Sequence, residues 1–154
     1  MIRVNVKGIA YDVMGNPIIL LTDQKEEKVL PIWIGLLEAH SIAVALGQMS
    51  VPRPLTHDLF KNALDTLGAR ISQVVITDLK DNTFYAEVHL ALPEQGIVLD
   101  ARPSDAVALA LRASAPVYLD DKLTEHMLSI KDLFDEETKA ELEKALEEYK
   151  KSLH

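Results

Sequence analysis

Strand-like segments in this chain come in groups of three, and a helical segment follows each group. The two groups are residues 2–6, 17–22 and 28–34, and residues 70–79, 83–92 and 96–101. Strands grouped in this way pair with their sequence neighbours, whereas a doubly wound parallel sheet needs strands and helices to alternate. The order predicts an α+β fold, a mixed β-sheet with helices packed on it, and suggests an internal duplication of a β-β-β-α unit.

The first helical segment, residues 35–49, is almost wholly apolar. Its only ionisable groups are Glu38 and His40. A helix without a polar face is normally buried. We therefore expect this helix to be enclosed, either by the sheet or by a second subunit.

A second helix has clear start and stop signals. Thr56 is a good N-cap, Asp58 complements the positive helix end, and Gly68 suits the left-handed residue after the last turn. The helix carries one apolar stripe, so we expect it to cover one face of the sheet. Ser104 is expected to cap a further helix at residues 105–113, and a last short helix is expected near residues 122–128.

The composition changes after Phe134. Residues 135–154 read DEETKAELEKALEEYKKSLH, a strong helix former with acids first and lysines last. This pattern predicts an amphipathic C-terminal helix, which either docks on the body or forms a short coiled-coil seam with a partner. We accordingly divide the chain into a domain at residues 1–130 and an acidic helical extension at residues 131–154.

The composition excludes several kinds of catalytic and binding site. The 154 residues include no cysteine, which excludes thiolate metal sites and cysteine nucleophiles. No apolar run reaches the ~20 residues of a membrane span, and the N-terminus lacks a secretory signal, so we expect a cytoplasmic protein with no membrane contact. The net charge of −8 disfavours binding of nucleic acid through a general electrostatic attraction to phosphate. Nucleic acid must therefore be bound locally, through a few arginines or a metal ion.

Two Arg-Pro junctions hold the candidate functional residues. Proline fixes the entry into each helix, and the free N–H groups of a helix start attract anions. The same residues also fit a structural interpretation, in which caps and ion pairs lock the loops. The substrate-binding candidates are Arg53, Thr56, Arg102 and Ser104, and the catalytic candidates from the junctions are His57, Asp58, Asp100 and Asp105.

The functional interpretation of these acids is a divalent metal site. Asp58, Asp100 and Asp105 would supply oxygen ligands to Mg²⁺ or Mn²⁺, and a metal-bound water could attack phosphorus. His57 could act as a general base or ligand, or donate to a neighbouring carboxylate. Glu38 is a further catalytic candidate, as a metal ligand or proton acceptor; if enclosed, it must be paired with Arg53 or Arg102, bound to metal or protonated.

Five segments, in order along residues 1–130, resemble the bifunctional nuclease (BFN) domain family. They are LPIWIGLLEAHSIAVAL, PRPLTHDLF, LGARISQVVITDL, TFYAEVHL and LDARPSDAVALALR. The resemblance implies a nuclease acting on both DNA and RNA. It also places Glu38 and the eight junction candidates on the family's recurring polar positions.

Two functions follow as alternatives. The first is a metal-dependent nuclease that hydrolyses phosphodiester bonds in DNA or RNA. The second is a non-catalytic binding or regulatory protein, a homo-oligomer and most simply a dimer, with an anion site at the two junctions. We expect convergence of Glu38, Asp58, Asp100 and Asp105 in one cleft for the nuclease, and dispersal or full arginine pairing for the binding protein.

Overall fold

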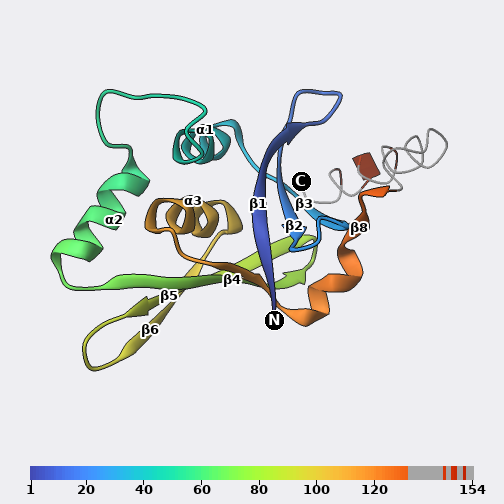
Figure 1. The fold of residues 1–154 in the computed structure, drawn as a ribbon. Helices are drawn as coiled ribbons and strands as arrows, with labels where there is room; N and C mark the ends of the chain where they lie inside the picture. Colours follow the sequence, from blue (N-terminus) through green and yellow to red (C-terminus); the bar gives the residue numbers. More distant parts are fainter. Residues whose placement is uncertain (132–143, 145–146, 149–150, 152–154) are drawn as a thin grey trace.

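A computed structural model describes residues 1–131 together with residues 144, 147–148 and 151. It has an α+β fold built on one eight-stranded mixed sheet, as predicted (Figure 1). The strands are β1 (Ile2–Tyr11), β2 (Pro17–Asp23), β3 (Lys28–Trp33), β4 (Arg70–Lys80), β5 (Thr83–Ala91), β6 (Gly96–Ala101), β7 (Val117–Leu119) and β8 (Leu128–Ser129). The helices are α1 (Leu36–Ala45), α2 (Thr56–Thr66), α3 (Pro103–Ala113) and the 3₁₀ helix η1 (Asp121–His126).

The strand order is β6-β5-β4-β7-β1-β2-β3-β8. Each group of three is an antiparallel meander, and β7 joins the groups by pairing antiparallel with β1 and parallel with β4. Strand β1 extends well past residue 6 because its register shifts between Val6 and Gly8, which absorbs the break in alternation. The order β-β-β-α therefore occurs in both halves of the sheet, although α2, which follows α1, has no α-helical counterpart directly after α3.

Helix α3 lies at the centre of the fold, with the sheet on one side and α1 and α2 beside it (Figure 1). Its alanines allow close approach, and Ala106, Val107 and Ala108 are completely buried. They pack on sheet residues such as Ile76 and Leu119, which are also inaccessible to solvent. Burial of each large aliphatic side chain stabilises the fold by roughly 1.5–3 kcal/mol, so this layer fixes where α3 begins.

Two expectations about the helices are wrong. Helix α2 has no buried residue and covers no part of the sheet, and its apolar stripe leaves Leu59 and Leu67 exposed by 65% and 79%. Helix α1 is shorter than residues 35–49, and the described chain encloses only part of it, because Ala39, Ser41 and Ile42 are buried whereas Leu36 and Leu37 are exposed. The sheet alone therefore does not enclose α1, which leaves a second subunit as the other expected cover. Helix α2 packs mainly on α3, whereas α1 packs on α3 and also on β1 and β2, and the described chain leaves the outer face of each helix exposed.

The helix starts also differ from prediction. The N-cap of α2 is Leu55, whose N–H is bound by the Asp58 carboxylate, and Thr56 is already the first helical residue. The N-cap of α3 is Arg102, because Pro103 occupies the first turn, where its fixed φ is favourable. Ser104 is therefore inside the helix and does not cap it. The region near residues 122–128 forms η1 and the two-residue strand β8, where one helix was expected.

The C-terminal extension, with its two alternative interpretations, lies largely outside the described residues. No helix in the described part of the chain is long and apolar enough to cross a membrane.

Candidate active site

Three helices meet at a chain of hydrogen bonds centred on His57. The imidazole Nε2 lies 2.8 Å from Oδ1 of Asp105, and Nδ1 lies 2.8 Å from Oγ of Ser41. A carboxylate can only accept, so Nε2–H donates to Asp105, and Nδ1 of the neutral ring accepts from the Ser41 hydroxyl. The network thus joins α1, α2 and α3 through one fixed tautomer. Ser41 is only 5% exposed, so it orients the ring and is poorly placed to attack a substrate.

Arg102 forms the exposed end of this network. Its Nη1 donates to Oε1 of Glu38 at 2.9 Å, while Nε and Nη2 donate to the two oxygens of Asp105 at 2.9 and 3.2 Å. These hydrogen bonds, with Asp105 first and Glu38 second, raise the pKa of Arg102. The guanidinium side chain remains 63% exposed, so it can still contact a ligand while holding both carboxylates.

Asp105 accepts hydrogen bonds from both Arg102 and His57. Partial burial acts to raise the pKa of its carboxyl group, but the hydrogen bonds from Arg102 and His57 outweigh that effect and hold the pKa below its ordinary value. Asp105 is therefore an ionised acceptor at neutral pH. Its position in the first turn of α3 adds a favourable interaction with the helix dipole.

A second ion pair lies deeper between the same helices. Nε of Arg112 donates to Oδ1 of Asp58 at 2.7 Å, and its other nitrogens donate to the backbone carbonyls of Ala108 and Ser41. The Arg112 side chain is 5% exposed. Partial burial raises the pKa of Asp58, but Arg112 and the Leu55 N–H lower it further, so the net pKa is depressed. This pair is a structural lock between α2 and α3.

Sequence reasoning missed Ser41 and Arg112. Ser41 follows Glu38 by three residues, and Arg112 follows Asp105 by seven, so each lies on the helix face of a residue already singled out. Helical spacing applied to α1 and α3 would have found both residues.

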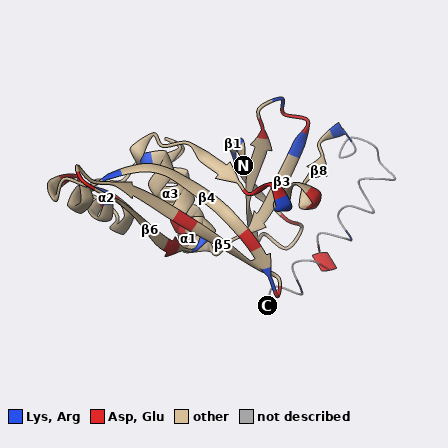
Figure 2. Cartoon of the chain, turned by 90° about the horizontal axis from the view of Figure 1, so that it is seen from below, with Lys and Arg blue, Asp and Glu red and all other residues tan. Residues whose placement is uncertain are grey.

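Asp100 lies elsewhere. Strand residues alternate faces, and the neighbours Leu99 and Ala101 pack against the core, so Asp100 points to the other side of the sheet. There it lies opposite Glu87 of β5 and lines a separate hollow with Tyr85 and Lys122. Figure 2 shows this outer face of β4, β5 and β6, with α1 and α3 behind it. Asp100 and Arg102 are two residues apart, so they would share a face and could pair if the strand continued, but Arg102 is the N-cap of α3 and pairs with Glu38 and Asp105 instead.

Arg53 and Thr56 are exposed, and neither makes a side-chain contact to the network in the described part of the chain. Of the sequence candidates, the structure brings together Glu38, His57, Arg102 and Asp105, places Asp58 next to them in its own pair, and separates Asp100. The expected convergence of four acids is not found, and the observed arrangement is the one expected above for the non-catalytic binding protein. Glu38, Asp58 and Asp105 each have an arginine partner.

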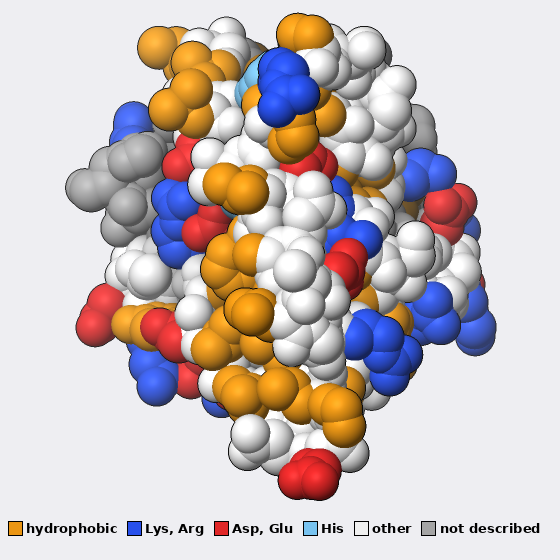
Figure 3. Space-filling model, turned by 90° about the vertical axis from the view of Figure 1, so that its left-hand side faces the viewer, with side chains coloured by type: hydrophobic (Ala, Val, Ile, Leu, Met, Phe, Trp, Pro, Cys, Tyr) orange, Lys and Arg blue, Asp and Glu red, His pale blue; other side chains and the backbone are white. Residues whose placement is uncertain are grey.

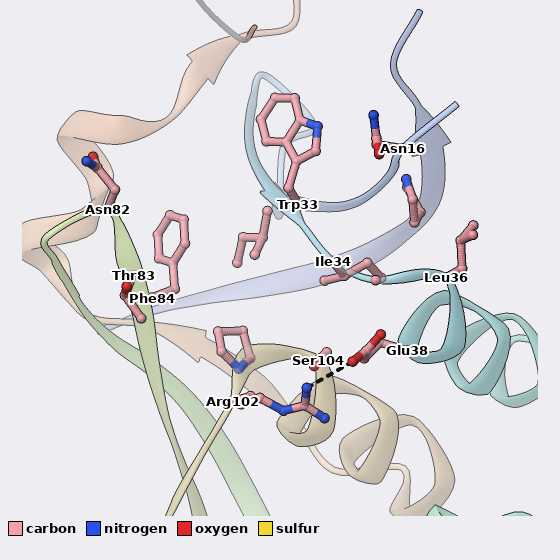
Figure 4. Close-up of a pocket in the computed structure, with 14 residues that line it drawn as sticks. Asn16, Trp33, Ile34, Leu36, Glu38, Asn82, Thr83, Phe84, Arg102 and Ser104 are labelled. Atoms are coloured by element: carbon pink, nitrogen blue, oxygen red, sulfur yellow. Dashed lines mark hydrogen bonds and ion pairs between the residues drawn. The ribbon is translucent and has the colours of Figure 1, made fainter. Parts of the chain in front are cut away.

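A hollow of about 410 Å³ opens beside the ion pair of Arg102 and Glu38 (Figure 4). Its walls come from the end of β3, the start of α1, the turn between β4 and β5, and the start of α3. Apolar side chains line much of the hollow, and the polar residues Glu38, Arg102 and Ser104 also contribute to its lining. The apolar lining includes Pro17, Ile32, Trp33, Ile34, Phe84 and Pro103.

Comparison with known proteins identifies the family. The model of the family described as "Bifunctional nuclease domain" matches residues 19–131, which is more than two thirds of the chain and includes every residue of the network. This chain belongs to the bifunctional nuclease domain family. The match confirms the resemblance seen in the sequence motifs.

Relatives of this BFN-domain chain fall into two groups. An uncharacterized protein of Mycobacterium tuberculosis is 40% identical over 154 residues, which cover 98% of this chain and 92% of that protein. Bifunctional nuclease 1 of Oryza sativa subsp. japonica is 27% identical over 111 residues, or 70% of this chain, and bifunctional nuclease 2 of Arabidopsis thaliana is 24% identical over the same length and share. This BFN-domain chain spans about a third of the length of each plant protein, 34% in both cases.

The expected three-aspartate metal site does not fit this BFN domain. Among the described residues, no three His, Asp or Glu side chains are grouped closely enough to hold an ion. The carboxylates of Glu38 and Asp105 do flank a single guanidinium, and Mg²⁺ is commonly bound by only one or two carboxylates with waters and substrate phosphate. Glu38 and Asp105 are thus enough carboxylates for an Mg²⁺ ion that also binds waters and a substrate phosphate.

Proposed function

We propose that this chain is a nuclease that hydrolyses phosphodiester bonds in DNA or RNA at the Glu38, Arg102 and Asp105 cluster. The observation that carries the proposal is the guanidinium of Arg102, which is exposed at the rim of a hollow while two carboxylates fix its orientation. Planar guanidinium groups match phosphate geometry, and a prepositioned cation offsets the charge that develops at phosphorus. The names of the plant relatives support the same activity.

Each residue of the cluster has a distinct role in this proposal. Arg102 contacts the scissile phosphate. Glu38, whose side chain is partly exposed, accepts the proton of the water that attacks phosphorus, the bond from phosphorus to one sugar oxygen breaks, and that oxygen takes a proton from solvent. Asp105 orients Arg102, and His57 acts through Asp105 as a positioning residue, because both of its ring nitrogens are already bonded.

We also propose that a divalent ion, Mg²⁺ or Mn²⁺, assists the reaction. Glu38 and Asp105 would hold it, while Asp58 is committed to Arg112 and Asp100 faces another side of the sheet. When bound, such an ion supplies Lewis acidity and lowers the pKa of water.

The test is cleavage of a fluorescently labelled single-stranded oligonucleotide by the purified chain, beside the Glu38→Gln variant. We expect cleavage that co-elutes with the protein, is lost in Glu38→Gln, stops with EDTA and returns with Mg²⁺ or Mn²⁺. The absence of cleavage, or equal cleavage by the variant, would overturn the nuclease proposal. Cleavage that EDTA does not affect would remove only the metal ion from it.

A second candidate function, assembly as a homodimer, is favoured by the uncovered apolar surface of α1 and α2. Figure 3 looks onto the end of the molecule that α2 forms, where hydrophobic side chains are exposed between charged ones. We propose that a second copy of this chain covers this surface. Two copies with a net charge of −8 repel each other, so an uncharged stripe is where they can meet, and a two-fold axis would place α2 against α2. The large exposed residues are Leu36, Leu37, Met49, Leu59, Phe60 and Leu67.

Light scattering across a range of protein concentrations tests this assembly. A mass near twice 17.1 kDa supports it, and a monomer at every concentration would reject it. If the dimer forms and no cleavage is found, the non-catalytic binding protein becomes the better account of the chain.

A further inference from the structure

The hollow beside Arg102 has features that the cleavage chemistry does not use. Trp33 lines it, and the indole N–H of Trp33 donates to Oδ2 of Asp12 at 3.1 Å, which holds the ring in one orientation. Ile34 and Phe84 line neighbouring parts of the wall (Figure 4). The volume of about 410 Å³ lies in the range of roughly 300–1,000 Å³ typical of small-ligand sites.

Ser104 adds a polar group to the same hollow. The residue is 5% exposed, it lines the hollow, and its hydroxyl group makes no hydrogen bond within the part of the chain that the structure describes. No side chain caps α3, whose first turn includes Ser104. A hydroxyl group that faces a hollow without a hydrogen-bond partner, next to uncapped helix N–H groups, is typical of a place where a ligand supplies the missing partner.

We infer that this hollow binds one unpaired nucleotide of a single strand, with its base against Trp33 and its phosphate at the start of α3. The inference rests on the proposed nuclease function and names its substrate class. A chain with a net charge of −8 gains little from a general attraction to the phosphate backbone, so contacts to the base must supply affinity. Aromatic side chains provide such contacts to unpaired bases without demanding one sequence.

A walled hollow of this kind favours single-stranded over double-stranded nucleic acid. A base inside a duplex is stacked and paired, and it would have to leave the helix before it could enter a walled hollow. An unpaired base avoids most of that cost. The nucleotide in the hollow then lies next to Arg102, which contacts the adjoining phosphodiester.

Intrinsic fluorescence tests the inference directly, because Trp33 is the only tryptophan in the chain. The probes are adenosine 5′-monophosphate and ribose 5-phosphate, added to the full chain with excitation outside the absorption of the base. We expect saturable quenching by the nucleotide and none by the sugar phosphate. No response to the nucleotide, or an equal response to ribose 5-phosphate, would overturn base binding.

Two variants test whether an oligonucleotide binds in this hollow or elsewhere on the molecule. Trp33→Leu should weaken binding of a labelled single-stranded oligonucleotide about tenfold or more, measured by anisotropy, because stacking on one aromatic ring is lost. Tyr85→Leu removes another exposed aromatic side chain, in the separate hollow on the outer sheet face, and should leave the affinity unchanged. Equal affinities for both variants would contradict the inference.

The outcomes also distinguish this inference from the nuclease proposal. Quenching by the nucleotide without any cleavage would retain the site and reject the enzyme. Cleavage with an unchanged KM in Trp33→Leu would retain the enzyme and reject the site.

Discussion

His57 and Asp105 are 48 residues apart in the sequence, yet Nε2 of the imidazole lies 2.8 Å from Oδ1 of the carboxylate. This contact ties α2 to the first turn of α3. The same carboxylate also accepts two hydrogen bonds from Arg102, which in turn holds Glu38 of α1. Asp105 is thus the central acceptor of a network that positions Arg102, the proposed phosphate-binding group, and through it Glu38, the proposed base.

Arg102→Lys should raise the KM for a single-stranded oligonucleotide by about tenfold. Lysine keeps the positive charge but cannot donate to Glu38 and to both oxygens of Asp105 at once, so charge-assisted hydrogen bonds are lost. Steady-state kinetics measure the effect. Arg3→Lys, at an exposed position of β1, is the matched control and should change nothing. An unchanged KM in Arg102→Lys would show that this guanidinium does not bind substrate.

Asp58→Asn should lower the free energy of unfolding by about 3 kcal/mol. The substitution leaves the guanidinium of Arg112 buried without its charged partner, which is the costly half of a broken buried pair. Urea denaturation at neutral pH measures the loss. Asp65→Asn on the same helix breaks only the exposed pair with Lys61 and should cost less than about 0.5 kcal/mol. Similar losses in the two variants would refute the structural lock.

Acid should weaken the lock between α2 and α3. The pKa of Asp58 in the folded chain is below its ordinary value of 3.8, so the unfolded chain binds this proton more readily. The stabilisation is complete above pH 3.8 and is lost as the pH falls through the lower, folded value. Urea denaturation at a series of acidic pH values should give a flatter pH dependence for Asp58→Asn than for the wild type. Parallel curves would contradict this linkage.

Phe60→Gln combined with Leu67→Gln should convert a dimer to a monomer. Both side chains are exposed on α2, so the substitutions remove apolar area from the proposed contact without disturbing the core. Light scattering and sedimentation measure the mass. Val98→Gln, an exposed apolar position on β6, is the control and should remain dimeric. A double variant that stays dimeric would place the contact elsewhere.

The strand groups could be predicted because hydrophobic alternation is a local property. Residues 70–79 and 83–92 became β4 and β5 with small changes at their ends. The role of β7 could not be predicted, since three residues carry no sign that they will bridge two meanders by pairing with β1 and β4. The apolar stripe of α2 was also recognisable, but a stripe does not say whether its partner is the sheet, another helix or a second subunit.

Part of the candidate site could also be predicted, because polar residues in an apolar or junction sequence are a local signal. Glu38, His57, Arg102 and Asp105 attracted attention as polar residues in apolar or junction sequence, and they do meet. Asp100 attracted the same attention, but one residue of strand alternation decides which face a side chain occupies, and the neighbouring Ala101 took the inner face. Ser41 was missed because a single serine in an apolar helix gives little signal until its partner on another helix is known.

The most direct measurement is the cleavage rate of a labelled single-stranded oligonucleotide by Asp105→Asn beside Asp100→Asn. The two substitutions are chemically identical. Asp105 lies in α3, which packs on the inner face of the sheet, whereas Asp100 lies on the outer face of β6. The account predicts that Asp105→Asn is slower by at least about 100-fold, because Arg102 and the proposed base Glu38 lose their common anchor, while Asp100→Asn retains the wild-type rate. Equal rates in the two variants, or a loss only in Asp100→Asn, would contradict the central claim.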